Sequence, residues 1–174
     1  FSLIKQGESG MAAVKKAVAG AKAEHKRPLA GLKYLVPIPN PGKIICLGLN
    51  YADHAAEAGS TPYSRPAGFI KHVDTLIADG DVIRKPSWTE KLDYETELAV
   101  VIADECVDVP AEEVYDHVFG YTIMNDVSAR DVQMDERKEG NIMIGKNFPS
   151  AAPLGPWVVT KDEIADPHKV PIKL

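Results

Sequence analysis

Short apolar runs, each three to six residues long, recur along the chain with turn-forming residues between them. Runs of this length and composition are typical of strands. The expected strands are residues 44–49, 67–71, 81–83, 98–103, 119–124 and 154–159. The pattern therefore predicts an all-β or β-rich roll.

Two helices are expected beside these strands. Residues 10–23 are rich in Ala, Val and Lys and contain no proline, and residues 111–117 follow Pro110, which suits a first helical turn. Four prolines between positions 27 and 43 break regular structure and mark a domain border. We predict an N-terminal helical appendage and linker over residues 1–38, and the main domain over residues 39–174.

Two glutamates, Glu95 and Glu97, open the apolar run at 98–103. In a strand they would project from the same face, about 7 Å apart, and Asp126 could supply a third oxygen. Like charges beside an apolar segment repel and lose hydration, so a cation is expected to compensate them. Oxygen ligands without neighbouring Cys or paired His favour Mg²⁺, with Mn²⁺ or Ca²⁺ as substitutes. The other interpretation is the solvated face of an antiparallel sheet.

A second candidate pair lies upstream. His54 and Glu57 are i, i+3 neighbours on a short predicted helix, so the carboxylate can reach the imidazole and raise its basicity. Such a pair is a water-activating base near neutral pH. On spacing alone, a chance pair on a surface helix is the better explanation.

Five motifs in this order resemble the fumarylacetoacetate hydrolase family, in particular its smaller members similar to 2-hydroxyhepta-2,4-diene-1,7-dioate isomerase. The motifs are GLNYADHAAE at 48–57, FIK at 69–71, DYETELA at 93–99, NDVSARDVQ at 125–133 and GK at 145–146. The resemblance covers about residue 39 to the end. It implies an α+β, mostly β, mixed roll or sandwich with short peripheral helices, and a homodimer.

The resemblance also implies roles for individual residues. It assigns the metal to Glu95, Glu97 and Asp126, and water activation to the pair of His54 and Glu57. It assigns the remaining positions to substrate binding or support of the site: Lys71, Arg130, Gln133 and, with a catalytic role, Lys146. In this family the helix that bears the histidine is often a lid.

The implied activity is hydrolysis of a carbon–carbon bond in acylpyruvate- or fumarylpyruvate-like 2-oxo (1,3-dicarbonyl) acids, of the kind met in aromatic catabolism. The reaction passes through a metal-bound enolate, whose charge the cation stabilises. The same site suits an isomerase, hydratase or decarboxylase of 2-oxo or 2-hydroxymuconate-type diacids. A metal-binding module without catalysis is the alternative from another class.

Two departures from the family pattern limit the resemblance. Residues 44–52 contain no acid, so we expect three protein ligands plus waters where longer members have a fourth carboxylate. No Gly-Thr-Pro segment occurs before the end, and the chain starts at Phe1. The catalytic domain is therefore expected to be incomplete at its C-terminus.

Composition narrows the range of partners. The net charge of −5 offers no basic field for nucleic acid or an anionic membrane. The partner that the resemblance implies is a small anionic 2-oxo acid. Cys46 and Cys106 lie in or beside apolar stretches, which favours buried free thiols in a reducing compartment. No apolar run is long enough for a signal peptide or membrane helix, so a cytoplasmic location is expected.

Several local features complete the expectations. Residues 58–66 and 134–141 are polar or rich in Gly and Pro, and we predict that both are mobile loops. An ordinary surface loop is the alternative for each. For Arg130, the alternative to substrate binding is a structural ion pair with Asp131, its neighbour in sequence.

Overall fold

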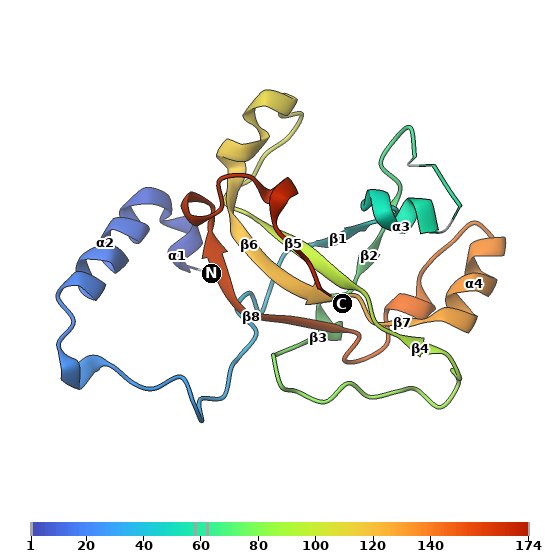
Figure 1. The fold of residues 1–174 in the computed structure, drawn as a ribbon, viewed down its shortest axis with the longest axis horizontal. Coiled ribbons are helices and arrows are strands. Elements are labelled where there is room, and N and C mark those ends of the chain that lie inside the picture. The colour runs from blue at the N-terminus through green and yellow to red at the C-terminus, as the bar shows by residue number, and fades with distance from the viewer. Residues whose placement is uncertain (1, 58, 62, 174) are drawn as a thin grey trace.

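A four-stranded sheet forms the centre of the computed structural model, which describes residues 2–57, 59–61 and 63–173 (Figure 1). Its strand order is β3-β8-β6-β5, with β3 parallel to β8 and the other neighbours antiparallel. The strands are β3 (Leu76–Ile77), β8 (Ala152–Thr160), β6 (Val118–Asn125) and β5 (Thr96–Ile102). Three of the apolar runs thus become the three long strands, and the expected mostly β, mixed architecture is confirmed.

Strand β6 is more buried than β8, because it has a long neighbour on each side, whereas β8 pairs on one side only with the two-residue β3. Met124 is buried on one face while Ile123 is exposed on the other, as the two-residue period of a strand requires. Gly120 allows β6 to approach β8 closely, since an added Cβ would lie 2.2 Å from the Val159 carbonyl oxygen. A larger residue at position 120 would therefore force the two strands apart.

Two short antiparallel ribbons flank the sheet. The first pairs β1 (Ile44–Leu47) with β2 (Gly68–Lys71), and the second pairs β4 (Leu92–Asp93) with β7 (Ser128–Ala129). The first ribbon ends at Lys71, and the second holds Asp93 beside the start of the following helix. Both ribbons therefore deliver a charged side chain to the same region.

Four α-helices and several short 3-10 turns complete the described chain. The α-helices are α1 (Ser2–Lys5), α2 (Gly7–Ala19), α3 (Ala52–Glu57) and α4 (Arg130–Lys138). The 3-10 turns are η1 (Ala23–His25), η2 (Val73–Thr75), η3 (Ala111–His117), η4 (Ile144–Lys146), η5 (Lys161–Glu163) and η6 (Pro167–Lys169). The helix expected at 10–23 is α2, displaced toward the N-terminus, and the helix expected at 111–117 is the 3-10 turn η3.

Two local expectations were wrong. Residues 81–83 form no strand, and most of the segment 134–141 is the second half of α4 rather than a loop. The helix has Asp131 in its first turn and two basic residues in its last, which complements the helix dipole, and Gly140 follows its end at φ +77°. The loop predicted at 58–66 includes Ala58 and Pro62, which lie outside the described residues.

Two clusters of buried side chains form the core. One contains Ile38, Met124, Ala152 and Leu154, and the other contains Val127, Ala129, Phe148 and Ala151. Asp126 lies just beyond the end of β6, between Met124 of the first cluster and Val127 of the second, and is itself buried. The core thus places one carboxylate in a poorly hydrated position that needs charged partners.

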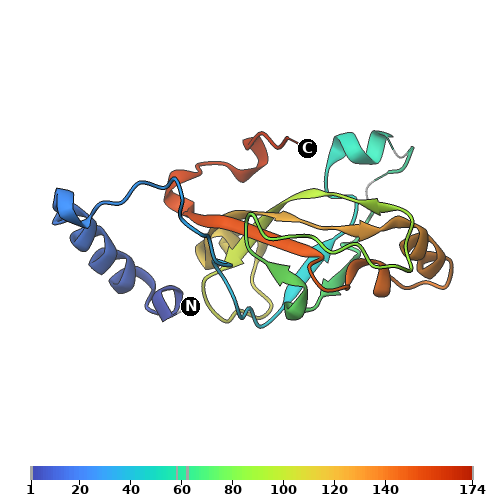
Figure 2. The same ribbon diagram turned by 90° about the horizontal axis from the view of Figure 1, so that it is seen from below.

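The N-terminal helices α1 and α2 lie at one end of the molecule, and α3 and α4 lie at the opposite end (Figures 1 and 2). Ile4 and Val36 nevertheless pack against the first core cluster, to which Ile38 belongs. The division into an appendage at 1–38 and a domain at 39–174 stays a prediction. Among the described helices, none has the length and apolar character needed to span a bilayer.

Candidate active site

Asp126 is the centre of a buried ionic network. One carboxylate oxygen accepts a hydrogen bond from Lys71 Nζ at 2.7 Å, and the other accepts one from Lys146 Nζ at 2.8 Å. Lys71 comes from the end of β2 and Lys146 from the turn η4, and each residue is only 1% exposed. Lys71 also donates to the backbone carbonyl of Lys146. Three distant segments therefore meet at one carboxylate.

The network continues outward as alternating charges. Lys146 Nζ donates to Glu95 Oε2 at 2.7 Å, and the other Glu95 oxygen accepts from Arg130 Nη1. Arg130 also binds Asp93 through Nε at 2.7 Å and Gln133 Oε1 through Nη1 at 3.0 Å. Of the three cations in the network, Arg130 is the most exposed, with its side chain 25% exposed against 2% for Lys146 and 0% for Lys71. A charged ligand would therefore meet Arg130 before the lysines.

The charges in this network shift one another's pKa values. Burial alone would raise the pKa of Asp126, but Lys146 and Lys71 outweigh it and hold that pKa below the usual range. Burial lowers the pKa of Lys71, and the adjacent Asp126 only partly opposes this. Cys46, on the core side of β1, has its pKa raised to about 12 by burial and then by Asp126, so it stays a neutral thiol. Cys106, by contrast, is exposed, against the expectation of burial.

Glu97 differs from the other two carboxylates because no lysine or arginine of the described chain forms an ion pair with it. Burial, followed by the repulsion of Glu95 and Asp126, raises its pKa to about 7, although a hydrogen bond with Tyr51 opposes the shift. The Tyr51 hydroxyl also accepts a hydrogen bond from the Leu98 backbone N–H at 3.0 Å. Glu97 is thus a carboxyl that titrates near neutral pH.

This shift predicts a pH dependence of stability. The pKa of Glu97 is raised from 4.5 to about 7, so the folded chain holds this proton more tightly than the unfolded chain does. The contribution of Glu97 to the free energy of unfolding is therefore expected to fall as pH rises from about 4.5 through about 7. Urea unfolding of the wild type and of Glu97→Gln across this pH range would show a flatter profile for the variant. Glu112→Gln, at an exposed position, should keep the wild-type slope, and an equally steep Glu97→Gln profile would contradict the assignment.

The donor set of Glu95, Glu97 and Asp126 fits a hard divalent cation. All three offer carboxylate oxygens, and the raised pKa of Glu97 marks a carboxylate that lacks a compensating positive charge. In the described part of the chain, however, no three Asp, Glu, His or Cys residues are grouped closely enough to hold a metal. The Lys146 ammonium lies between Glu95 and Asp126 and bonds to both. The metal assignment stays a prediction that rests on donor chemistry.

His54 and Glu57 lie three positions apart on one short helix. Both lie on α3 and both are exposed, and no hydrogen bond joins their side chains to each other or to the ionic network within the described residues. The chain does connect the two regions, because Tyr51, just before α3, reaches Leu98 beside Glu97. The predicted dyad therefore remains a prediction, and in this conformation it is not assembled.

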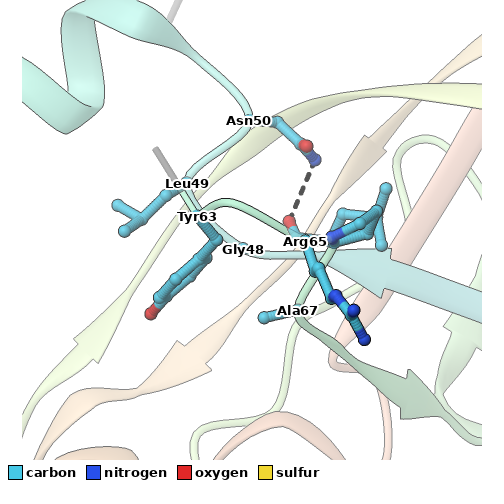
Figure 3. Close-up of a pocket in the computed structure, with 8 residues that line it drawn as sticks. Gly48, Leu49, Asn50, Tyr63, Arg65 and Ala67 are labelled. Carbon is cyan, nitrogen blue, oxygen red and sulfur yellow. Dashed lines mark hydrogen bonds between the residues drawn. The ribbon is translucent and has the colours of Figure 1, made fainter. Parts of the chain in front are cut away.

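An open pocket lies beyond the end of the β1–β2 ribbon, where the chain leads into α3 (Figure 3). Asn50, Tyr63 and Arg65 contribute polar groups to its lining, and Asn50 Nδ2 donates to the Leu47 carbonyl at 3.1 Å. Farther along the same ribbon, the ring of Phe69 lies 5.2 Å from Lys146 Nζ, within cation–π distance. The ribbon thus links the pocket to the ionic network.

Sequence reasoning missed several contacts in this region. Asp93 binds Arg130, for which a pair with Asp131 had been the alternative, and Asp131 accepts from Thr89 Oγ1 at 2.6 Å. Asp93 stands two residues before Glu95, so the alternation that singled out Glu95 and Glu97 also includes it. No pattern in the sequence indicated that the Phe69 ring would lie beside the Lys146 ammonium.

Comparison with known proteins identifies the family of this chain. Residues 43–174 match the family described as Fumarylacetoacetate (FAA) hydrolase C-terminal. The chain belongs to this fumarylacetoacetate hydrolase family. Enzymes of the family generally use a divalent metal.

Several relatives within the fumarylacetoacetate hydrolase family are named as tautomerases or isomerases. The mitochondrial oxaloacetate tautomerase fahd2 of Xenopus laevis is 40% identical over 171 residues, which cover 98% of this chain and 52% of the relative. The oxaloacetate tautomerase YisK of Bacillus subtilis is 42% identical over 149 residues, 83% of this chain and 48% of the relative. A crystal structure of 5-carboxymethyl-2-hydroxymuconate delta-isomerase from Mycobacterium smegmatis matches with a TM-score of 0.66 and 42% identity, covering 77% of this chain and 52% of that chain. The chain therefore spans about half the length of these relatives.

Proposed function

We propose that the protein interconverts the enol and keto forms of a 2-oxo diacid, with oxaloacetate as the first substrate to test. The names of the relatives favour this isomerase alternative over the carbon–carbon hydrolysis expected from the sequence. The observation that carries the proposal is the alternating network in which Lys71, Lys146 and Arg130 converge on Asp126 and Glu95. It holds three cationic groups in fixed, poorly hydrated positions, and a cation held in this way can stabilise the charge that develops on an enolate oxygen.

The reaction can be written for this chain's own residues. Going from enol to keto, the enol oxygen loses a proton and the neighbouring carbon gains one, with no net consumption of water. Between these steps, negative charge develops on the oxygen. A preorganised ammonium such as Lys146, 2% exposed and held by two carboxylates, stabilises that charge without reorganising.

Substrate binding would begin at the solvent side of the network. Arg130 presents a planar guanidinium there, which suits a carboxylate of the diacid, and Gln133 steadies it through a hydrogen bond at 3.0 Å. A divalent cation held by Glu95, Glu97 and Asp126 would act as a Lewis acid toward the 2-oxo group.

The contrast with hydrolysis lies in the need for activated water. Hydrolysis requires an assembled base such as His54 with Glu57, whereas tautomerisation requires only proton transfer to and from the substrate. The two side chains are exposed, and no hydrogen bond or ion pair joins them in the described part of the chain. This favours tautomerisation as the activity of the conformation described.

The experiment follows the loss of the enol form of oxaloacetate in the full chain, with Mg²⁺ and with EDTA. We expect accelerated loss with Mg²⁺, little with EDTA, and a decrease of about 10²-fold in Arg130→Met, because a substrate carboxylate loses its charged partner. Arg84→Met, at an exposed arginine of the same charge, should behave as the wild type.

Product analysis separates the competing activities. Keto oxaloacetate without pyruvate supports the proposal, whereas pyruvate from oxaloacetate would make the protein a decarboxylase. Cleavage of acetylpyruvate or fumarylpyruvate, without acceleration of the enol reaction, would restore the hydrolase expectation. Absence of any turnover with the metal bound would favour the alternative that the protein is a metal-binding module without catalysis.

A further inference from the structure

The turn that carries Lys146 is held by a carboxylate on another element. Glu136, on α4, accepts hydrogen bonds from three successive backbone N–H groups. The Ile144 N–H donates to Oε1 at 2.6 Å, and those of Met143 and Gly145 donate to Oε2 at 3.1 and 3.0 Å. These are the residues immediately before Lys146.

The turn needs such an acceptor. A single 3-10 turn satisfies few of its own N–H groups, and η4 spans only Ile144–Lys146. Burial opposes ionisation of Glu136, but the three backbone hydrogen bonds outweigh it and lower the pKa of its carboxyl. Glu136 is therefore a charged acceptor near neutral pH, and its hydrogen bonds are of the stronger, charge-assisted kind.

The turn also fits tightly against α4. An added Cβ at Gly145 would lie 2.7 Å from the backbone nitrogen of Gln133, so the turn cannot shift toward the helix. On the other side, Asn147 Nδ2 donates to the Ile70 carbonyl at 3.0 Å. With Glu136 in place, the turn is fixed between α4 and β2.

One face of α4 therefore carries the residues that contact the ionic network and the turn before Lys146. Arg130, Gln133 and Glu136 follow each other at intervals of three residues, which places them on the same side of the helix. The first binds Glu95 and Asp93, the second binds Arg130, and the third holds the turn before Lys146. The stripe extends the predicted site by one residue beyond Gln133.

We propose that Glu136 is a positioning residue that sets the Lys146 ammonium between Glu95 and Asp126. Its effect on turnover rests on the proposed function, in which Lys146 stabilises the developing charge. The effect of Glu136 on the position of Lys146 is independent of the proposed function, and this effect can be measured without any substrate.

The test is lysine acetylation of the native full chain, read residue by residue by mass spectrometry. In the wild type, Lys146 should react slowly because it is buried and bonded to two carboxylates. In Glu136→Ala we expect Lys146 to react about tenfold faster or more, as local opening of its turn becomes easier, while Lys71 stays protected. Glu136→Gln, which keeps one carbonyl acceptor, should lie between, and Glu139→Gln on the exposed end of the helix should match the wild type.

The outcomes separate positioning from general loosening. Faster labelling of Lys146 alone, with a reduced kcat, a nearly unchanged KM and partial recovery in Glu136→Asp, supports the proposal. Wild-type labelling of Lys146 in both Glu136→Ala and Glu136→Gln overturns it, and so does an equal rise at Lys71 and Lys146. If labelling changes as expected but no variant or wild type turns over oxaloacetate, the proposed function fails while the positioning role stands.

Discussion

Replacing Asp126 with alanine is expected to lower the free energy of unfolding by about 3–5 kcal/mol, because it leaves two buried ammonium groups without their shared partner. Lys71 and Lys146 have side chains only 0% and 2% exposed, and Asp126 accepts from both. Neither lysine can reach water without disturbing β2 or η4. Urea or thermal unfolding at neutral pH measures the difference.

Two further variants make this result interpretable. Asp135→Ala breaks an exposed ion pair with Lys138 and should change stability by less than about 1 kcal/mol. Asp126→Asn keeps the shape and one acceptor but loses the charge, so it should still be destabilised. If Asp126→Ala is no less stable than Asp135→Ala, the network does not hold the fold together as its geometry implies.

Replacing Lys146 with methionine is expected to lower kcat for oxaloacetate by about 10²–10³-fold, the usual effect of removing one preorganised charge from the transition state. Methionine has a similar length but no charge, and Phe69 gives it an apolar neighbour. KM should change less than kcat, because Arg130 remains to receive the substrate.

The matched control is Lys138→Met, since Lys138 is 73% exposed and pairs with Asp135 at the surface. It should leave kcat and KM at wild-type values. Unchanged turnover in Lys146→Met would remove this ammonium from the proposed chemistry, provided that circular dichroism shows the variant to be folded.

The apolar runs were sufficient to predict the family's mostly β architecture. The runs at 98–103, 119–124 and 154–159 became β5, β6 and β8, because each run supplies apolar side chains to the first core cluster. The helix α4 escaped prediction because its sequence, RDVQMDERK, has no apolar stripe. Side-chain hydrogen bonds hold α4 in place instead, and a prediction from hydrophobic periodicity cannot detect such bonds.

The candidate site was predictable as a set of residues but not as a set of contacts. Motif order picked out Lys71, Asp126 and Lys146, which the structure brings into one network. The alternative pair of Arg130 with Asp131 was wrong because neighbours one position apart on a helix do not face each other. Arg130 reaches Asp93, 37 positions away, only through the pairing of β4 with β7. The roles of His54, Glu57 and the metal ligands stay predictions.

The meeting of three segments at Asp126 has a consequence for how the protein can diversify. Lys71 is separated from Asp126 by 55 positions and from Lys146 by 75, so the ionic contacts fasten the β1–β2 ribbon to the rest of the chain. A substitution at Lys71, Asp126 or Lys146 changes both the candidate active site and the contacts that hold the β1–β2 ribbon to the rest of the chain. Selection therefore cannot alter the activity at these positions without also altering stability. Changes in substrate preference are therefore expected to accumulate at exposed residues that line the pocket beyond this ribbon, such as Arg65 and Tyr63. A side chain can vary at these positions while the fold is kept.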